Sequence, residues 1–145
     1  MVVLGSSLQN FRMKGDHRFQ HEKLRVYHEA VEFSDMVDRV VAKYGPNRPL
    51  MKNLKRSSES VLYNIAEAAA EYRPLEKGRI YRIALREAEE SAAALAKEWR
   101  RTTDPLIAEA IAMDRGICAM LVGLARKMDR RAATARDLPT PPRPP

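Results

Sequence analysis

Apolar residues recur every three or four positions in four stretches of this chain, and none shows the sustained alternation typical of a β-strand. The first two stretches run from about residue 22 to 44 and from about 49 to 72. A helix gathers such positions on one face, so these faces are predicted to point inward. The predicted inward residues are Val26, Ala30, Phe33, Val37, Val40 and Tyr44, followed by Met51, Leu54, Ser58, Val61, Ile65, Ala68 and Tyr72.

The third and fourth stretches run from about residue 75 to 101 and from about 105 to 131. The third is rich in Ala and Ser, which allows neighbouring helices to approach closely. The predicted inward residues here are Ile80, Ala84, Ala88, Ser91 and Leu95, with Ile83 and Ala94 beside them, then Ile107, Ala110, Ile117, Leu121, Leu124 and Met128.

Helix-breaking residues separate the four stretches. Gly45 tolerates a left-handed helix cap and Pro46 does not continue a helix, so the first helix is expected to end there. Pro74 forces the second break, and Asp104 before Pro105 is a strong helix start signal. Short joints between amphipathic helices predict an all-α fold, an antiparallel up-down-up-down four-helix bundle.

Composition changes this picture only at the two ends of the chain. Residues 1–20 are expected to be a flexible basic arm, 21–131 the four-helix bundle, and 132–145 a disordered Pro-rich tail. Of the net charge of +7, residues 1–20 carry +2 and residues 130–145 carry +3. An excess of positive charge favours an anionic partner, although the body between these ends carries only +2.

The sequence contains no sign of an export route or of catalysis. No apolar run approaches the roughly 18 residues that span a bilayer, so we expect a cytoplasmic protein with no membrane partner. No GxSxG, P-loop, HExxH or GxGxxG motif is present, so we expect no enzyme and no cofactor. His17 and His21 are four residues apart, but nothing completes a metal site around them, and no metal is expected.

Four side chains near the apolar faces, one cysteine and three glutamates, also have structural explanations. Cys118 lies near the apolar face of the fourth helix and is interpreted as a small buried hydrophobe. Glu67, Glu87 and Glu90 lie near apolar stripes, where a di-iron site would also require Glu-x-x-His pairs that the chain lacks. These carboxylates are therefore expected to pair with Arg or to accept hydrogen bonds at a helix or subunit interface.

Positive side chains cluster at the start of the second helix and along the third. Lys52, Lys55 and Arg56 share one face, and their charges oppose the helix dipole at an N-terminus, so phosphate binding is a natural role. The cations of the third helix have acidic neighbours, which makes a solvated face an equally good explanation. The predicted nucleic-acid-binding residues are Arg48, Lys52, Lys55, Arg56, Arg79 and Arg82.

Three blocks of the chain resemble the 23S rRNA intervening-sequence proteins, a family of four-helix bundles. The blocks are HEKLRVYHEAVEFSDMV (21–37), SVLYNIAEAAAEY (60–72) and RIYRIALREAEES (79–91). The second is the most specific, through the run Asn64, Ile65, Ala66 and Glu67. In it Leu62 replaces a family Pro and Ala68 a family Gly. The resemblance implies a homo-oligomer, a pentamer, that associates with RNA. The positive cluster of the second helix contains no aromatic residue to stack on an unpaired base, so it predicts binding to structured RNA or duplex DNA.

The same resemblance extends to accessory proteins of diversity-generating retroelements, which implies a second function. The chain is then an adaptor whose main partner is a reverse transcriptase. Independent support for oligomerisation comes from Leu62, Ala69 and Tyr81. These residues lie outside the main inward stripes and are expected to leave apolar surface that a ring of subunits would bury.

Overall fold

The computed structural model describes residues 16–137, and these residues form helices and no strand. The all-α prediction is therefore confirmed for this part of the chain, while most of the expected arm and the end of the expected tail lie outside it. The elements, in chain order, are η1 (Gln20–Lys23), a 3-10 helix, and the α-helices α2 (Arg25–Tyr44), α3 (Pro49–Ala70), α4 (Pro74–Thr102) and α5 (Pro105–Asp137).

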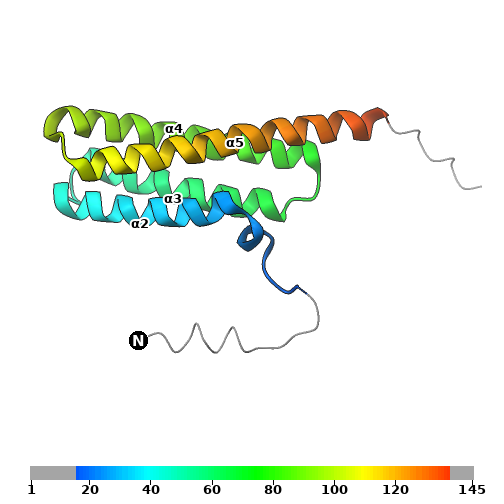
Figure 1. The fold of residues 1–145 in the computed structure, drawn as a ribbon, viewed down its shortest axis with the longest axis horizontal. Coiled ribbons are helices and arrows are strands. Elements are labelled where there is room, and N and C mark those ends of the chain that lie inside the picture. The colour runs from blue at the N-terminus through cyan, green and yellow to red at the C-terminus, as the bar shows by residue number, and fades with distance from the viewer. Residues whose placement is uncertain (1–15, 138–145) are drawn as a thin grey trace, which may run out of the picture.

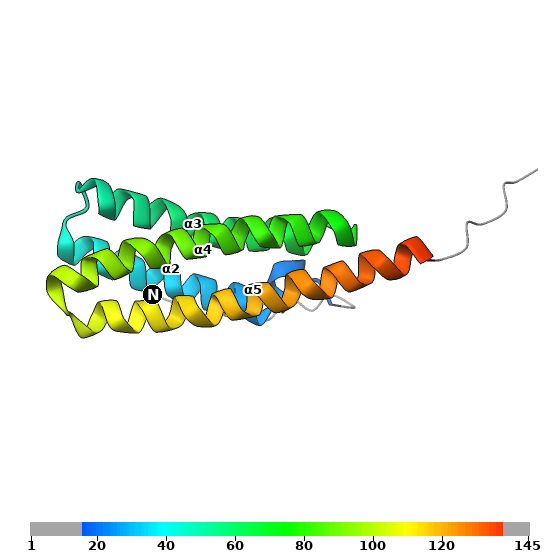
Figure 2. The ribbon, with the colours of Figure 1, turned by 90° about the horizontal axis from the view of Figure 1, so that it is seen from above.

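The four long helices lie side by side, and each short turn reverses the direction of the chain (Figures 1 and 2). α2 and α4 each pack against α3 and α5, whereas no close backbone contact joins α2 to α4 or α3 to α5. This ring of contacts encloses one core. Among its fully buried side chains are Phe33, Leu54, Ile65, Leu95 and Leu121. The last turns of α5 project beyond the turn that joins α3 to α4 (Figure 2).

The core agrees closely with the predicted inward positions. On α2 and α3 every predicted residue is buried except the two tyrosines, and on α4 the whole main stripe is buried. On α5 only Leu124 is partly exposed. Tyr44 is half-buried, and Tyr72 is 87% exposed because α3 ends two residues before it. The apolar spacing therefore located most of the core, but it missed Met36, Val41 and Tyr81, which are buried as well.

The turns have the backbone conformations that their residues favour. Gly45 ends α2 with a φ of 104°, which a residue with a side chain rarely adopts. Asp104 caps α5: its carboxylate accepts a hydrogen bond of 2.9 Å from the backbone N–H of Leu106. The carboxylate also accepts hydrogen bonds from Lys43 and Tyr44 of α2, so one residue ties the α4–α5 turn to the end of α2.

Two predicted helix ends are wrong. α3 stops at Ala70 because the Glu71 carboxylate accepts hydrogen bonds from the backbone N–H and the guanidinium of Arg73, which fixes a non-helical turn before Pro74. α5 continues past the expected end at Arg131 to Asp137. Residues 132–137 contain no helix breaker, and the hydroxyl of Thr134 donates to the carbonyl of Arg130 inside the helix.

The apolar surface expected for oligomerisation is also smaller than predicted. Ala69 is only 6% exposed and Tyr81 only 1%, so both belong to the core of a single subunit. Leu62 is partly buried. The large apolar side chains that are exposed among the described residues are instead Phe19, Tyr63, Tyr72, Leu75 and Trp99.

Candidate nucleic-acid interface

The six predicted binding residues do not form one site. The first four lie at the start of α3, where Arg48 reaches Glu98 near the end of α4 and Arg56 reaches Glu87 near its middle. Arg79 lies in the first two turns of α4, about 28 Å along the helix from Glu98 but only about 12 Å from Glu87. Arg56 contacts α4 from the α3 side, whereas Arg82 reaches Asp129 of α5, so the two groups face different neighbouring helices.

Arg48 has a structural role. Its guanidinium donates to both oxygens of Glu98, at 3.0 and 3.1 Å, and the Glu98 side chain is completely buried. Arg101 donates to the same carboxylate. The hydrogen bond from Arg48 holds the pKa of Glu98 at about 2, against the opposing effect of burial. Because a buried carboxylate without partners costs several kcal/mol, Arg48 is not free to bind phosphate.

Most of the α3 cluster is paired as well. Lys55 contacts Asp38 of α2 at 2.9 Å and Glu59 at 3.3 Å. Arg56 contacts Glu90 of α4 at 2.7 Å and Glu87 at 3.3 Å, as expected for those two carboxylates. The exposed side chain of Lys52 has no carboxylate within 4.0 Å among residues 16–137. Within the described part of the chain, Lys52 is therefore the one cation of this cluster that forms no ion pair.

The two predicted cations of α4 are also paired. Arg79 donates to Glu76 one turn earlier, at 2.6 Å, and Arg82 forms an ion pair with Asp129 of α5. Exposed pairs of this kind contribute little to stability, roughly 0–1 kcal/mol each. They nevertheless place a negative charge beside each guanidinium, which weakens its attraction for a phosphate.

The largest group of cations without partners lies on the C-terminal half of α5, where sequence reasoning placed no site. Arg126, Lys127, Arg130 and Arg131 are all exposed, and within the described part of the chain none has a carboxylate within 4.0 Å. Together with Lys77 of α4 we call these residues the α5 cation cluster. Their spacing brings like charges to positions i and i+4, an arrangement that disfavours the helix.

Lys77 shows how positive this region is. Burial lowers the pKa of its ammonium group, and the charges of Arg131 and Lys127 lower it further, against the opposing charge of Glu71. A surface hollow of about 460 Å³ lies beside this position, lined by Lys127, Arg130, Arg131, Thr134 and Ala135. Three members of the cluster, Lys127, Arg130 and Arg131, therefore line one shallow surface hollow. The sequence signal that marks it is the run of four cations in 126–131 with a single acid, Asp129.

Two buried polar groups lie elsewhere on α5. Asp114 is completely buried, and its Oδ2 atom has no hydrogen-bond partner in the part of the chain that the structure describes. Burial raises the pKa of this carboxyl to about 7. The thiol of Cys118 donates a weak hydrogen bond to Asp114, and burial raises the pKa of the thiol to about 12. A thiol that keeps its proton is a poor nucleophile.

The described residues contain no cluster of three or more His, Cys, Asp or Glu side chains that is able to hold a metal ion. No helix among them is long and apolar enough to cross a membrane.

The fold and the surface define a class: an all-α protein of four long helices with a group of exposed cations on the last helix. Within that class, the model of the family described as 23S rRNA-intervening sequence protein matches residues 22–121, and the chain belongs to this family. The matched region covers α2, α3 and α4 and about half of α5, so it includes Lys77 but stops before the four members of the cation cluster that lie on α5. No curated protein matches the chain, and no solved structure matches it.

Proposed function

We propose that this chain is a non-enzymatic protein that assembles into a homo-oligomer and binds RNA or another nucleic acid through the α5 cation cluster. One observation supports this function most directly. Of the six cations predicted from sequence, five are paired with carboxylates, whereas Arg126, Lys127, Arg130 and Arg131 are exposed without such partners among the described residues. Cations of this kind bind phosphates without first losing an ion pair.

The chemistry of the cluster favours a phosphate backbone over a small anion. Arg126, Lys127, Arg130 and Arg131 span about one and a half turns of a helix, and the helix rise spreads them over about 8 Å. One strand of a duplex carries a phosphate about every 3.4 Å along its axis, so this span faces about two or three phosphates. Because phosphate contacts position a nucleic acid without reading its bases, we expect binding to be sensitive to salt and largely independent of sequence.

Assembly would strengthen this binding. The proposed oligomer is built from up-down-up-down bundles, and the family resemblance implies that it contains five of them. A ring repeats the α5 cation cluster in every subunit, and repeated weak contacts to one polyanion combine through avidity. The exposed side chains of Tyr63 and Leu75, 67% and 60% accessible, provide apolar surface for subunit contacts. Light scattering at micromolar concentration tests this step, and a monomeric mass would refute it.

Binding is tested with two variants that remove the same charge. The α5 variant carries Lys127→Gln, Arg130→Gln and Arg131→Gln, and the α3 variant carries Lys52→Gln, Lys55→Gln and Arg56→Gln. Fluorescence anisotropy with a labelled RNA hairpin should show at least tenfold weaker binding for the α5 variant and at most a threefold loss for the α3 variant. Circular dichroism and light scattering verify that both variants keep their helicity and mass. If the α3 variant instead bound more weakly than the α5 variant, the binding site would lie on α3.

A further inference from the structure

The one tryptophan of the chain lies on the surface near the end of α4, between two hollows. Trp99 is 36% exposed, although large aromatic side chains are usually more deeply covered in a helical protein of this size. Its indole N–H donates to no protein acceptor among residues 16–137. Neither the core nor the α5 cation cluster accounts for its exposure, because Lys127 lies 16 residues, or about 24 Å, along α5 from Ile111 beside Trp99.

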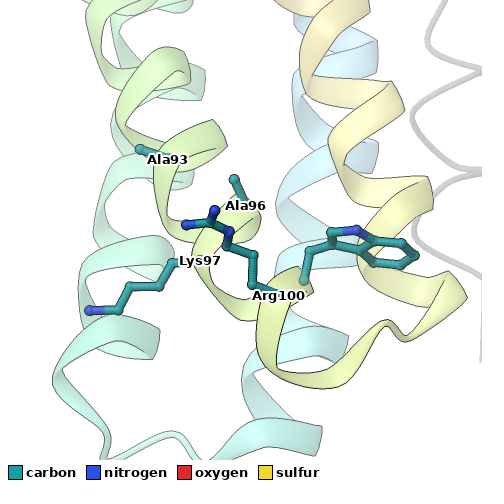
Figure 3. Close-up of a pocket in the computed structure, with 5 residues that line it drawn as sticks. Ala93, Ala96, Lys97 and Arg100 are labelled. Carbon is teal, nitrogen blue, oxygen red and sulfur yellow. The ribbon is translucent and has the colours of Figure 1, made fainter.

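The first hollow has a volume of about 560 Å³ and is lined by Ala93, Ala96, Lys97, Trp99 and Arg100. In Figure 3 the side chain of Arg100 lies along α4 beside Ala96, and Lys97 extends outward next to it. Both cations are exposed, and neither has a carboxylate within 4.0 Å in the described part of the chain. The floor of the hollow is therefore apolar while its rim is positively charged.

The second hollow, of about 430 Å³, lies on the α5 side of Trp99. It is lined by Ala92, Ala96, Trp99, Ala108, Ile111 and Arg115. Arg115 is exposed and, among residues 16–137, also has no carboxylate within 4.0 Å. Small side chains leave space against the indole on both sides, and each space has an unpaired cation of the described chain at its edge.

We infer that Trp99 and these two hollows bind unpaired nucleotides of single-stranded nucleic acid. The ligand must offer flat apolar groups for the indole and the alanine floors, and negative charges for Lys97, Arg100 and Arg115. Nucleotides of an unpaired strand have both, since every base has a stacking face and every linkage a phosphate. Bases in a duplex are stacked on one another, so a duplex satisfies the cations but leaves the indole uncovered.

A second copy of the chain is a poorer occupant of this surface. Like charges would meet if the same surface of two subunits came together, because Lys97, Arg100 and Arg115 are all positive. A different surface of a second subunit would have to bring carboxylates to both hollows at once. This inference shares the ligand class of the proposed function but uses other residues, so the two are separable by experiment.

Intrinsic fluorescence gives a direct test, because tryptophan emission from this protein reports on Trp99 alone. The full chain is titrated with a 12-nucleotide oligoadenylate and, separately, with a blunt RNA duplex of 12 base pairs. We expect saturable quenching by the single strand and little quenching by the duplex, although the duplex binds through α5. Absence of quenching by oligoadenylate at low salt would overturn the inference, whether or not the duplex binds.

Variants separate stacking from charge. Lys97→Gln combined with Arg100→Gln keeps the fluorophore and should weaken oligoadenylate binding at least fivefold, and Trp99→Leu, followed by anisotropy, should weaken it by at least as much. The α5 variant should keep the quenching. Wild-type affinity of the Trp99→Leu protein for oligoadenylate would refute the inference. A drop in its mass by light scattering with helicity retained would also refute it, by showing that Trp99 lies at a subunit contact.

Discussion

Replacing Asp114 with Asn should make the protein more stable at neutral pH and remove much of the pH dependence of its stability. The Asp114 carboxyl is completely buried and one of its oxygens has no hydrogen-bond partner among the described residues. Burial raises its pKa from 3.8 to about 7. The nearby thiol of Cys118 stays neutral below pH 12 and supplies no positive charge, and the closest charge that affects Asp114 is the like charge of Glu89.

The direction of the pH dependence follows from the pKa of Asp114 in the folded and in the unfolded protein. In the unfolded chain the carboxyl loses its proton near pH 4, whereas in the folded protein it keeps the proton until about pH 7. Unfolding therefore releases a proton between these values, and the free energy of unfolding falls as the pH rises from about 4 to 7. A shift of about three pKa units corresponds to roughly 4 kcal/mol at most. Above pH 7 the folded protein carries the full cost of a buried charged carboxylate, and the pH no longer changes this cost.

Urea unfolding followed by circular dichroism at pH 5, 6, 7 and 8 measures this effect. Asn has nearly the same shape and no charge, so the variant and the wild type should be most similar near pH 4. The variant should be more stable by about 1–2 kcal/mol at pH 5 and by a few kcal/mol at pH 8. Glu109→Gln, which removes an exposed carboxylate from the same helix, is the matched control and should change little. The reasoning is refuted if the difference between Asp114→Asn and the wild type is the same at pH 5 and pH 8.

Three further changes test individual parts of the fold by thermal or urea unfolding. Arg48→Met should lower the free energy of unfolding by about 3 kcal/mol, because Glu98 stays buried with one partner fewer. Adding Glu98→Gln should recover part of this loss. An unchanged free energy of unfolding in Arg48→Met would contradict the structural role of Arg48. Thr103→Gly should stabilise by roughly 0.5–1 kcal/mol, since Thr103 has a φ of 48°, and destabilisation would contradict this. Asp104→Ala should cost about 1–2 kcal/mol because α5 loses its cap, and an unchanged midpoint would count against the cap.

Helices and core were predictable because they depend on local spacing. An inward stripe such as Val26, Ala30 and Phe33 is visible without knowledge of its neighbours. Helix ends were harder, because the end of α3 depends on the contacts that Glu71 makes with Arg73, and α5 continues through residues that were assigned to a tail. Burial of Tyr81 and Glu98 depends on where α4 meets its neighbours, which the spacing within one helix does not specify.

The binding site was less predictable for a physical reason. A cluster of cations in sequence becomes an anion site only if no carboxylate from another helix reaches it, and such contacts are long-range. Arg56 meets Glu90 from 34 residues away, and Arg82 meets Asp129 from 47 residues away. The α5 cation cluster was equally visible in the sequence, but its residues lie where the predicted last helix was expected to give way to a tail.

The salt dependence of RNA binding tests most directly whether the α5 cation cluster binds nucleic acid. The affinity of the full chain for an RNA hairpin is measured from 50 to 300 mM salt, for the wild type, the α5 variant and the α3 variant. When a cation that binds a phosphate is replaced by Gln, the slope of log affinity against log salt becomes shallower by about 0.7–0.9. We predict that the α5 variant flattens this slope by about 2 or more and the α3 variant by less than about 1. An unchanged slope in the α5 variant would contradict nucleic-acid binding by the α5 cation cluster.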